Sequence, residues 1–161
     1  MQTVVKDVVL VGGGHSHVIL LKRFAMRPEP SLRLTLICTD SHTPYFGMLP
    51  GYMAGHYDND SVHIDLSRLA VSAGARLYRD EVIGLDRSGT QVLCRNRPPV
   101  PYDRLSINIG STPQLSGVLG AARHVIPDEP IQAFNQRWLN LLGRAQQRTE
   151  GVLLCYKLDG R

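Results

Sequence analysis

The stretch that decides the fold is 8-VVLVGGGHSHVILL-21, in which an apolar run is followed by three glycines and then by apolar residues at helical spacing. A continuous apolar run that ends at a glycine turn is typical of a strand buried on both faces of a parallel sheet. The helical spacing continues to Met26 and stops before 28-PEP-30, because proline ends a helix. The sequence therefore predicts a strand, a tight turn and a helix in this order.

The glycine turn matches most of the G-x-G-x-x-G pattern of dinucleotide-binding folds. Gly12 would permit the tight turn, and Gly14 would let the backbone approach a pyrophosphate. The amides of His15 and Ser16 would then face the phosphates at the positive end of the helix dipole. His17 stands where the pattern has its last glycine, so we expect either a helix that lies further from the strand or an imidazole that points sideways toward solvent or ligand. A purely structural turn is the alternative interpretation.

The end of the next strand also departs from the pattern. The run 32-LRLTLIC-38 alternates apolar residues and is predicted to be the second parallel strand, beside the first. An acidic residue that binds the ribose hydroxyls is expected at its end. Cys38 occupies that position, and Asp40 follows two residues later. Asp40 could reach a ribose from the loop, and a solvated turn residue is the alternative.

The rest of the chain alternates strand and helix patterns. Residues 41–57 hold three glycines and two prolines and are predicted to form a long, functional loop, with room for one helical turn in it. A short helix follows over 66–73, with Asp65 or Ser61 as its cap. The remaining predicted elements are a hairpin of 76–86 and 90–94, a third strand from about Pro101, a strand over 104–110, an amphipathic helix over 130–147 and a strand over 152–156.

Composition limits the classes of function. The 161 residues suffice for one packed domain, and 43% hydrophobic with 20% charged residues is ordinary for a soluble globular protein. The net charge of +4 comes from scattered basic residues, so no nucleic-acid partner is predicted. Three distant cysteines indicate neither disulfides nor a metal site, and no apolar run approaches the roughly 20 residues of a transmembrane segment. Without a signal-peptide pattern, a cytoplasmic location is the expectation.

Further motifs follow the glycine turn in a fixed order, namely 34-LTLICTD-40, 43-TPYFGMLPGYMAGHY-57, 81-EVIGLD-86 and 102-YDRLSINIGSTP-113. Together they resemble the two-dinucleotide-domain flavoproteins of the pyridine nucleotide-disulfide oxidoreductase superfamily. The chain looks most like the type II NADH dehydrogenase-like and sulfide:quinone reductase branch, and more narrowly like the flavoprotein module found fused to selenide, water dikinase. The resemblance implies an α/β fold: a Rossmann-like FAD-binding fold with a parallel sheet and a β-meander at about 76–103.

The resemblance also implies a cofactor-binding role for the positions that match family motifs. These candidates are Gly12, Gly14, His15, Ser16, Cys38, Asp40, Met48, Leu49, Pro50, Val82 and Gly110. The glycine turn and the helix start would bind the pyrophosphate of FAD, and Cys38 and Asp40 would stand at the adenosine ribose. His17 is then a variation at a packing position, and His17→Gly is expected to leave FAD affinity unchanged or to raise it.

The later motifs imply contacts with the rest of the cofactor. Residues 48–50 would line the flavin ring or the ribityl chain, and Val82 would meet the adenine through its backbone. Gly110 would approach the cofactor at the end of a strand, where Asn108 and Ile109 replace the first two residues of the family's A-T-G motif. No catalytic residue is assigned, because the flavin itself accepts the hydride.

The resemblance stops before the end of the chain. In the family, a second glycine turn that binds NAD(P)H follows the helix that matches 130–147, whereas 152-VLLCYKLDGR-161 has no such turn. We therefore expect residues 1–150 to be the N-terminal part of an FAD-binding domain and 151–161 to be the truncated start of a second domain or a tail. NAD(P)H would be the electron donor only in full-length relatives, and the electron acceptor is unknown. The expected partner is the missing remainder of the flavoprotein or a fused kinase-like domain.

The expected function is thus the FAD-binding domain of an NAD(P)H-dependent flavin oxidoreductase, not catalytically complete on its own. Two alternatives stay open. A single NAD(P)-binding Rossmann domain would share the glycine turn but would continue strand–helix–strand rather than insert a meander. A non-catalytic remnant or partner-binding fragment would bury the exposed half of its sheet on another chain.

Overall fold

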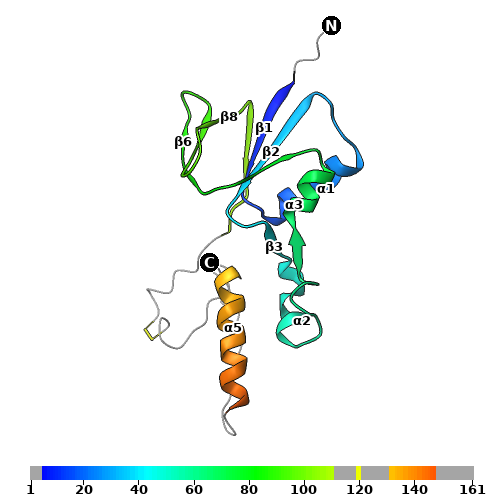
Figure 1. The fold of residues 1–161 in the computed structure, drawn as a ribbon, viewed down its shortest axis with the longest axis vertical. Helices are drawn as coiled ribbons and strands as arrows, with labels where there is room; N and C mark the ends of the chain where they lie inside the picture. Colours follow the sequence, from blue (N-terminus) through cyan, green and yellow to red (C-terminus); the bar gives the residue numbers. More distant parts are fainter. Residues whose placement is uncertain (1–4, 111–118, 121–130, 148–161) are drawn as a thin grey trace. The chain divides into compact units, whose positions relative to one another are not determined.

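The computed structural model describes residues 5–110, 119–120 and 131–147 of the chain (Figure 1). The chain divides into two compact units, Met1–Ile109 and Gly110–Arg161. In the first unit the elements are β1 (Lys6–Val11), α1 (His15–Met26), β2 (Leu32–Cys38), β3 (His42–Pro44), the 3-10 helix η1 (Phe46–Met48), α2 (Leu49–Met53), β4 (His63–Asp65), α3 (Leu66–Ser72), β5 (Arg76–Arg79), β6 (Val82–Asp86), β7 (Gln91–Cys94), β8 (Val100–Pro101) and β9 (Arg104–Ile107). In the second unit, α5 spans Ile131–Gln146.

A four-stranded parallel sheet in the order β5-β2-β1-β9 forms the centre of the first unit. Helices α1 and α3 lie on one side of this sheet, and the antiparallel meander β6-β7-β8 lies on the other (Figure 1). Leu10, Leu21 and Leu36 belong to the core on the helix side, whereas Val9 and Ile37 belong to the core on the meander side. Alternate residues of the same buried strands thus supply both cores, and the predicted α/β fold with a parallel sheet and a meander is confirmed.

The predicted hairpin begins six residues later than the sequence suggested. Residues Arg76–Arg79 pair with β2 as the fourth parallel strand, and the hairpin starts only at Val82. The break lies at Asp80, which is 6% exposed and whose backbone N–H donates to the Cys38 carbonyl. Its carboxylate accepts hydrogen bonds from the backbone and side chain of Asn96. This buried network turns the chain from one sheet into the next, and a strand-like pattern on both sides of it conceals the break.

The segment expected to be a loop has regular structure of its own. Strands β3 and β4 form an antiparallel ribbon, and η1 and α2 lie between them along the chain. Asp65 caps α3 by accepting hydrogen bonds from Ser67 and Arg68, so this predicted cap is confirmed. The predicted helix over 130–147 matches α5, and the strand predicted over 152–156 lies outside the described residues. No described helix combines the length and the apolar character needed to cross a membrane.

Candidate cofactor-binding site

The glycine turn between β1 and α1 is packed tightly against the end of β9. Gly12 has a φ of +91°, which favours glycine, and a Cβ placed there would lie 2.3 Å from the Asn108 carbonyl oxygen. A Cβ on Gly14 would lie 2.4 Å from Oδ1 of the same asparagine. The backbone N–H of Gly14 donates to the Asn108 carbonyl at 3.2 Å. Gly12 is therefore required for the close approach of the Asn108 backbone, whereas a side chain at position 14 would displace the Asn108 carboxamide. The sequence presented Asn108 only as a departure from the family motif.

The helix that follows the turn begins without a cap. Gly14 stands at the N-cap of α1 and provides no side-chain hydrogen bond, and the first turn contains no acidic residue. No described group accepts a hydrogen bond from the backbone N–H of His15 or Ser16, and both side chains are exposed. Uncapped N–H groups at the positive end of a helix dipole bind oxyanions. The start of α1 therefore fits the pyrophosphate of a dinucleotide.

His17 holds the turn from inside the protein. Its side chain is only 2% exposed, and its ring lies between the Gly12 carbonyl, 2.7 Å from Nδ1, and the Ser106 hydroxyl, 2.9 Å from Nε2. Because a carbonyl only accepts, Nδ1–H donates to Gly12, and Nε2 can accept from Ser106. The expectation that the ring points toward solvent or ligand is therefore wrong. The imidazole instead joins the turn to β9.

The residues expected at the adenosine ribose differ in their accessibility. Cys38 is 7% exposed and packs in the helix-side core, and its carbonyl accepts from the Asp80 N–H. Burial, with a further contribution from the charge of Asp40, raises the pKa of the Cys38 thiol to about 11. The thiol is thus a core group. Asp40 is half-buried at the carboxyl end of the sheet, where one of its carboxylate oxygens accepts from the His42 N–H at 3.1 Å. Asp40 is therefore the better candidate for the ribose.

The motif segment after β3 contacts the start of α1 through Tyr45. The rings of His15 and Tyr45 stack with their centroids 4.8 Å apart, and a Cβ on Gly47 would lie only 3.0 Å from the tyrosine ring. The N–H of Met48 donates to the Tyr45 carbonyl. The structure therefore brings the 45–48 segment beside the uncapped amides of α1. Tyr45 was not among the residues expected at the site, although an aromatic residue two positions before a glycine in a motif loop was an available indication.

The other predicted site residues lie at different points of the fold. Leu49 is buried in α2, Met48 is half-buried and Pro50 is exposed. Val82 begins β6 and packs against the core on the meander side. Gly110 is exposed and begins the second unit, and a Cβ placed on it would have no described atom within 4 Å. Their contacts with a cofactor remain predictions.

Comparison with known proteins supports the resemblance. No protein-family model matches the chain. The chain is 24% identical over 153 residues to the NADH dehydrogenase-like protein YutJ of Bacillus subtilis strain 168, and the match covers 92% of this chain and 41% of YutJ. The chain thus spans less than half the length of this curated relative.

Solved structures show the same fold. The sulfide:quinone oxidoreductase of Aquifex aeolicus matches with a TM-score of 0.66 and 19% identity, over 86% of this chain and 32% of that one. NDH2 of Plasmodium falciparum, solved in complex with NADH, matches with a TM-score of 0.64 and 14% identity, over 88% of this chain and 30% of that one. The predicted similarity to the N-terminal part of the pyridine nucleotide-disulfide oxidoreductases, and the Rossmann-like fold, are confirmed.

Proposed function

We propose that this chain is the FAD-binding part of an NAD(P)H-dependent flavin oxidoreductase. The main support is the uncapped start of α1, whose free amides at His15 and Ser16 adjoin a glycine turn that is fixed by Asn108 and His17. The meander β6-β7-β8 favours this function over a single NAD(P)-binding domain, which would continue with another strand–helix–strand unit. The similarity to a NADH dehydrogenase-like protein is consistent with both the cofactor and the donor.

Each candidate residue then has a defined task in binding. The amides of His15 and Ser16 hold the pyrophosphate, and Asp40 accepts hydrogen bonds from the adenosine ribose. The 48–50 segment excludes water from the flavin side, and Val82 contacts the adenine through its backbone. FAD, when bound, supplies the ring that accepts a hydride. The chain's own contribution is to bind and orient this ring, so no residue needs to donate or accept a proton.

We further propose that the 161 residues bind FAD but do not catalyse NADH oxidation by themselves. The chain spans 41% of YutJ and about a third of each structure compared above, so the nicotinamide site of such proteins would come from other residues. In this proposal residues 1–150 form the FAD-binding domain, and 151–161 belong to a second domain or a tail. The electron acceptor, a fused kinase-like partner and a cytoplasmic location remain predictions.

A pair of substitutions at Ser16 tests the pyrophosphate site. Ser16→Asp places a carboxylate in the first turn of α1, where it should stabilise the helix by about 0.3–1 kcal/mol through the dipole while repelling a pyrophosphate. Ser16→Asn is the matched control, because it has nearly the same shape without the charge. We expect flavin fluorescence titrations to show at least about tenfold weaker FAD binding for Ser16→Asp, an unlowered melting temperature, and near wild-type binding for Ser16→Asn.

Three results would contradict the proposal. Wild-type FAD affinity in Ser16→Asp would remove the start of α1 as the pyrophosphate site. Tighter binding of NADH than of FAD by the purified chain would favour a single NAD(P)-binding domain. Steady oxidation of NADH with an added electron acceptor would show that the 161 residues are catalytically complete.

A further inference from the structure

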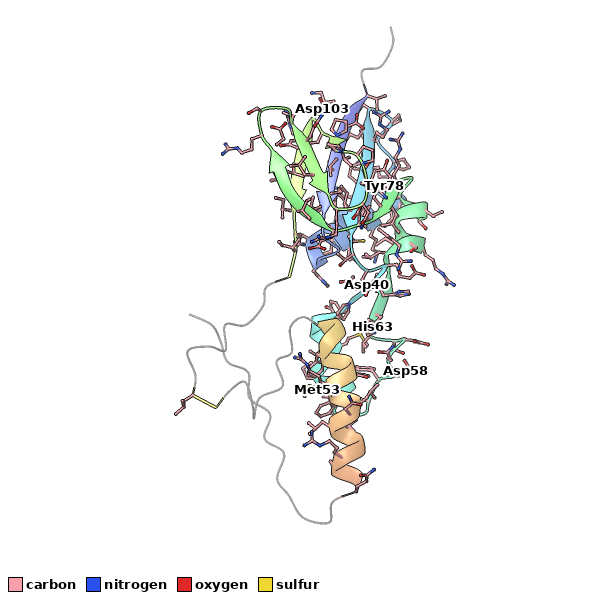
Figure 2. The ribbon with its side chains drawn as sticks, turned by 60° about the vertical axis from the view of Figure 1, so that its left-hand side comes forward. Asp40, Met53, Asp58, His63, Tyr78 and Asp103 are labelled. Atoms are coloured by element: carbon pink, nitrogen blue, oxygen red, sulfur yellow. The ribbon has the colours of Figure 1, made fainter. Side chains whose placement is uncertain are left out.

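A cavity of about 280 Å³ lies between the sheet and the segment 97–101, which leads from β7 into β8. Its floor contains Arg33, Thr35 and Arg76, which come from the amino-terminal halves of β2 and β5. The glycine turn follows the carboxyl end of β1 in the same parallel sheet. Figure 2 shows the separation of these two ends, with Asp103, which is hydrogen-bonded to the start of β1, at one end and Asp40 at the other. The cavity is therefore separate from the candidate cofactor site.

Three arginines line the cavity, and two of them are paired within residues 5–110. Arg33 forms an ion pair with Asp7, and the Nε of Arg97 donates to Asp80 at 3.2 Å. Arg76 forms no hydrogen bond or ion pair within the described part of the chain. The pKa of Asp7 is lowered mainly by its hydrogen bond with Arg33 and only to a smaller extent by the charge of Arg76. The guanidinium of Arg76 thus remains available for an oxyanion. Its planar set of N–H donors can form hydrogen bonds with two oxygens of a carboxylate or phosphate at the same time.

Thr35 adds a buried polar group beside this cation. It is 4% exposed, it lines the cavity, and it is the register partner of Arg76 across the β2–β5 pair. Its hydroxyl has no hydrogen-bond partner among residues 5–110, although it stands in an otherwise apolar strand core. A buried hydroxyl without a partner costs free energy, and a ligand atom in the cavity would remove this cost.

The opposite wall of the cavity is formed by Arg97 and by the apolar residues that follow it. The guanidinium of Arg97 lies over the Tyr78 ring, 3.9 Å from its centroid, and thereby holds the start of the 97–101 segment against the sheet. Pro98, Pro99 and Val100 complete this wall. A cavity with a cation and a hydroxyl on one side and proline rings on the other suits a molecule with one oxyanion group and a small apolar body.

We propose that this cavity binds a small organic anion, with its carboxylate or phosphate between Arg76 and the Thr35 hydroxyl and its apolar body against residues 98–100. The site is independent of FAD binding, because it shares no residue with the glycine turn or the start of α1. A carboxylate and a phosphate monoester both place oxygens at these donors. The titration below therefore compares one anion of each kind.

The test is an NMR titration of the uniformly ¹⁵N-labelled chain with benzoate, phenyl phosphate and, as a neutral probe of similar shape, benzyl alcohol. We expect one of the two anions to produce saturable shifts at the amides of Thr35, Arg76 and Val100, and benzyl alcohol to produce none. Arg76→Gln and the nearly isosteric Thr35→Val should each weaken binding at least about tenfold. FAD affinity should be unchanged in both variants, which separates this site from the proposed cofactor site.

Arg79→Gln is the matched control for charge. Arg79 lies three residues along the same strand, and strand alternation places it on the opposite face of the sheet. Its substitution removes the same charge without touching the cavity, so anion binding should stay within about twofold of wild type. Absence of saturable shifts with both anions would overturn the proposal. An equal loss of binding in Arg79→Gln and Arg76→Gln would also overturn it, because it would show attraction to net charge alone.

Discussion

Replacement of His17 by alanine is the most direct perturbation of the glycine turn. The substitution removes two hydrogen bonds, of 2.7 Å to the Gly12 carbonyl and 2.9 Å to the Ser106 hydroxyl, from a side chain that is 2% exposed. Each bond contributes about 1 kcal/mol net, and the groups left unpaired and the void left by the ring add to the loss. We expect His17→Ala to lower the free energy of unfolding by about 3–4 kcal/mol.

Two smaller substitutions separate the two hydrogen bonds. His17→Asn keeps a donor near the position of Nδ1 and should retain the bond to Gly12, whereas Ser106→Ala removes only the bond at Nε2. Each should cost about 1–2 kcal/mol in urea unfolding followed by circular dichroism. A double-mutant cycle of His17→Ala with Ser106→Ala should then show a coupling energy of about 1 kcal/mol, because the second substitution removes a bond that the first has already broken.

The same variants distinguish a positioning role from a purely structural one. Because His17 fixes the carbonyl of the turn that precedes the free amides of α1, FAD affinity should fall at least about tenfold in His17→Ala and less in His17→Asn under conditions where both are folded. The two hydrogen bonds of the buried ring reverse the expectation from the resemblance for His17→Gly, which should weaken FAD binding as His17→Ala does, with about 1 kcal/mol of further loss of stability from glycine inside a helix. The reasoning is refuted if His17→Ala and His17→Gly unfold within about 0.5 kcal/mol of wild type and bind FAD at least as tightly.

Two further predictions concern the buried groups Asp80 and Cys38. Burial raises the pKa of Asp80, but hydrogen bonds, including those from Asn96 and Arg97, outweigh it and hold the pKa below the ordinary 3.8. The stability that this carboxylate contributes is therefore present above about pH 4 and is lost as the pH falls further. The urea midpoint should fall less steeply with pH below about pH 4 in Asp80→Asn than in wild type. Equal dependence of the midpoint on pH in the two proteins would contradict this. Because the pKa of Cys38 is raised to about 11, iodoacetamide at pH 8 should modify it only after urea unfolding, as site-resolved mass spectrometry would show; rapid labelling of the folded chain would contradict the burial.

The order of the first elements could be predicted because each rests on local signals. The apolar run before Gly12 and the helical spacing after it specify β1 and α1 within a residue or two. The cap of α3 at Asp65 could be predicted for the same reason, since the capping carboxylate and the N–H groups that donate to it lie within one turn. In contrast, the boundary between β5 and β6 depends on Asp80, whose partners lie 16 and 17 residues further along the chain. Periodicity contains no information on such distant partners, so the two strands were predicted as one.

The candidate site could likewise be predicted where it rests on local sequence signals, but not where it depends on distant residues. The glycines and the free helix amides follow from the motif, and position 17 is a packing position as expected, but the motif does not predict that His17 bonds to Ser106, which is 89 residues away. Asn108 departs from the family's A-T-G motif, and yet its carbonyl accepts a hydrogen bond from the turn and its carboxamide packs against Gly14. Cys38 shows the opposite case. Its place at the strand end indicated a ligand, whereas the structure packs its side chain in the helix-side core, and its contact with a cofactor remains a prediction.

The departures at positions 17, 106 and 108 explain one another. Ser106 and Asn108 are two residues apart, and their side chains meet the start of α1 on the same side of the sheet. A glycine at the third position of the fingerprint suits a neighbouring strand that offers only small apolar residues, because helix and strand can then pack directly. Here the strand offers a hydroxyl, which would be left unpaired by a glycine and which the buried imidazole satisfies. The third position of the pattern therefore depends on the strand that closes against it, and a histidine there is compatible with an intact glycine turn when its partner on β9 is polar.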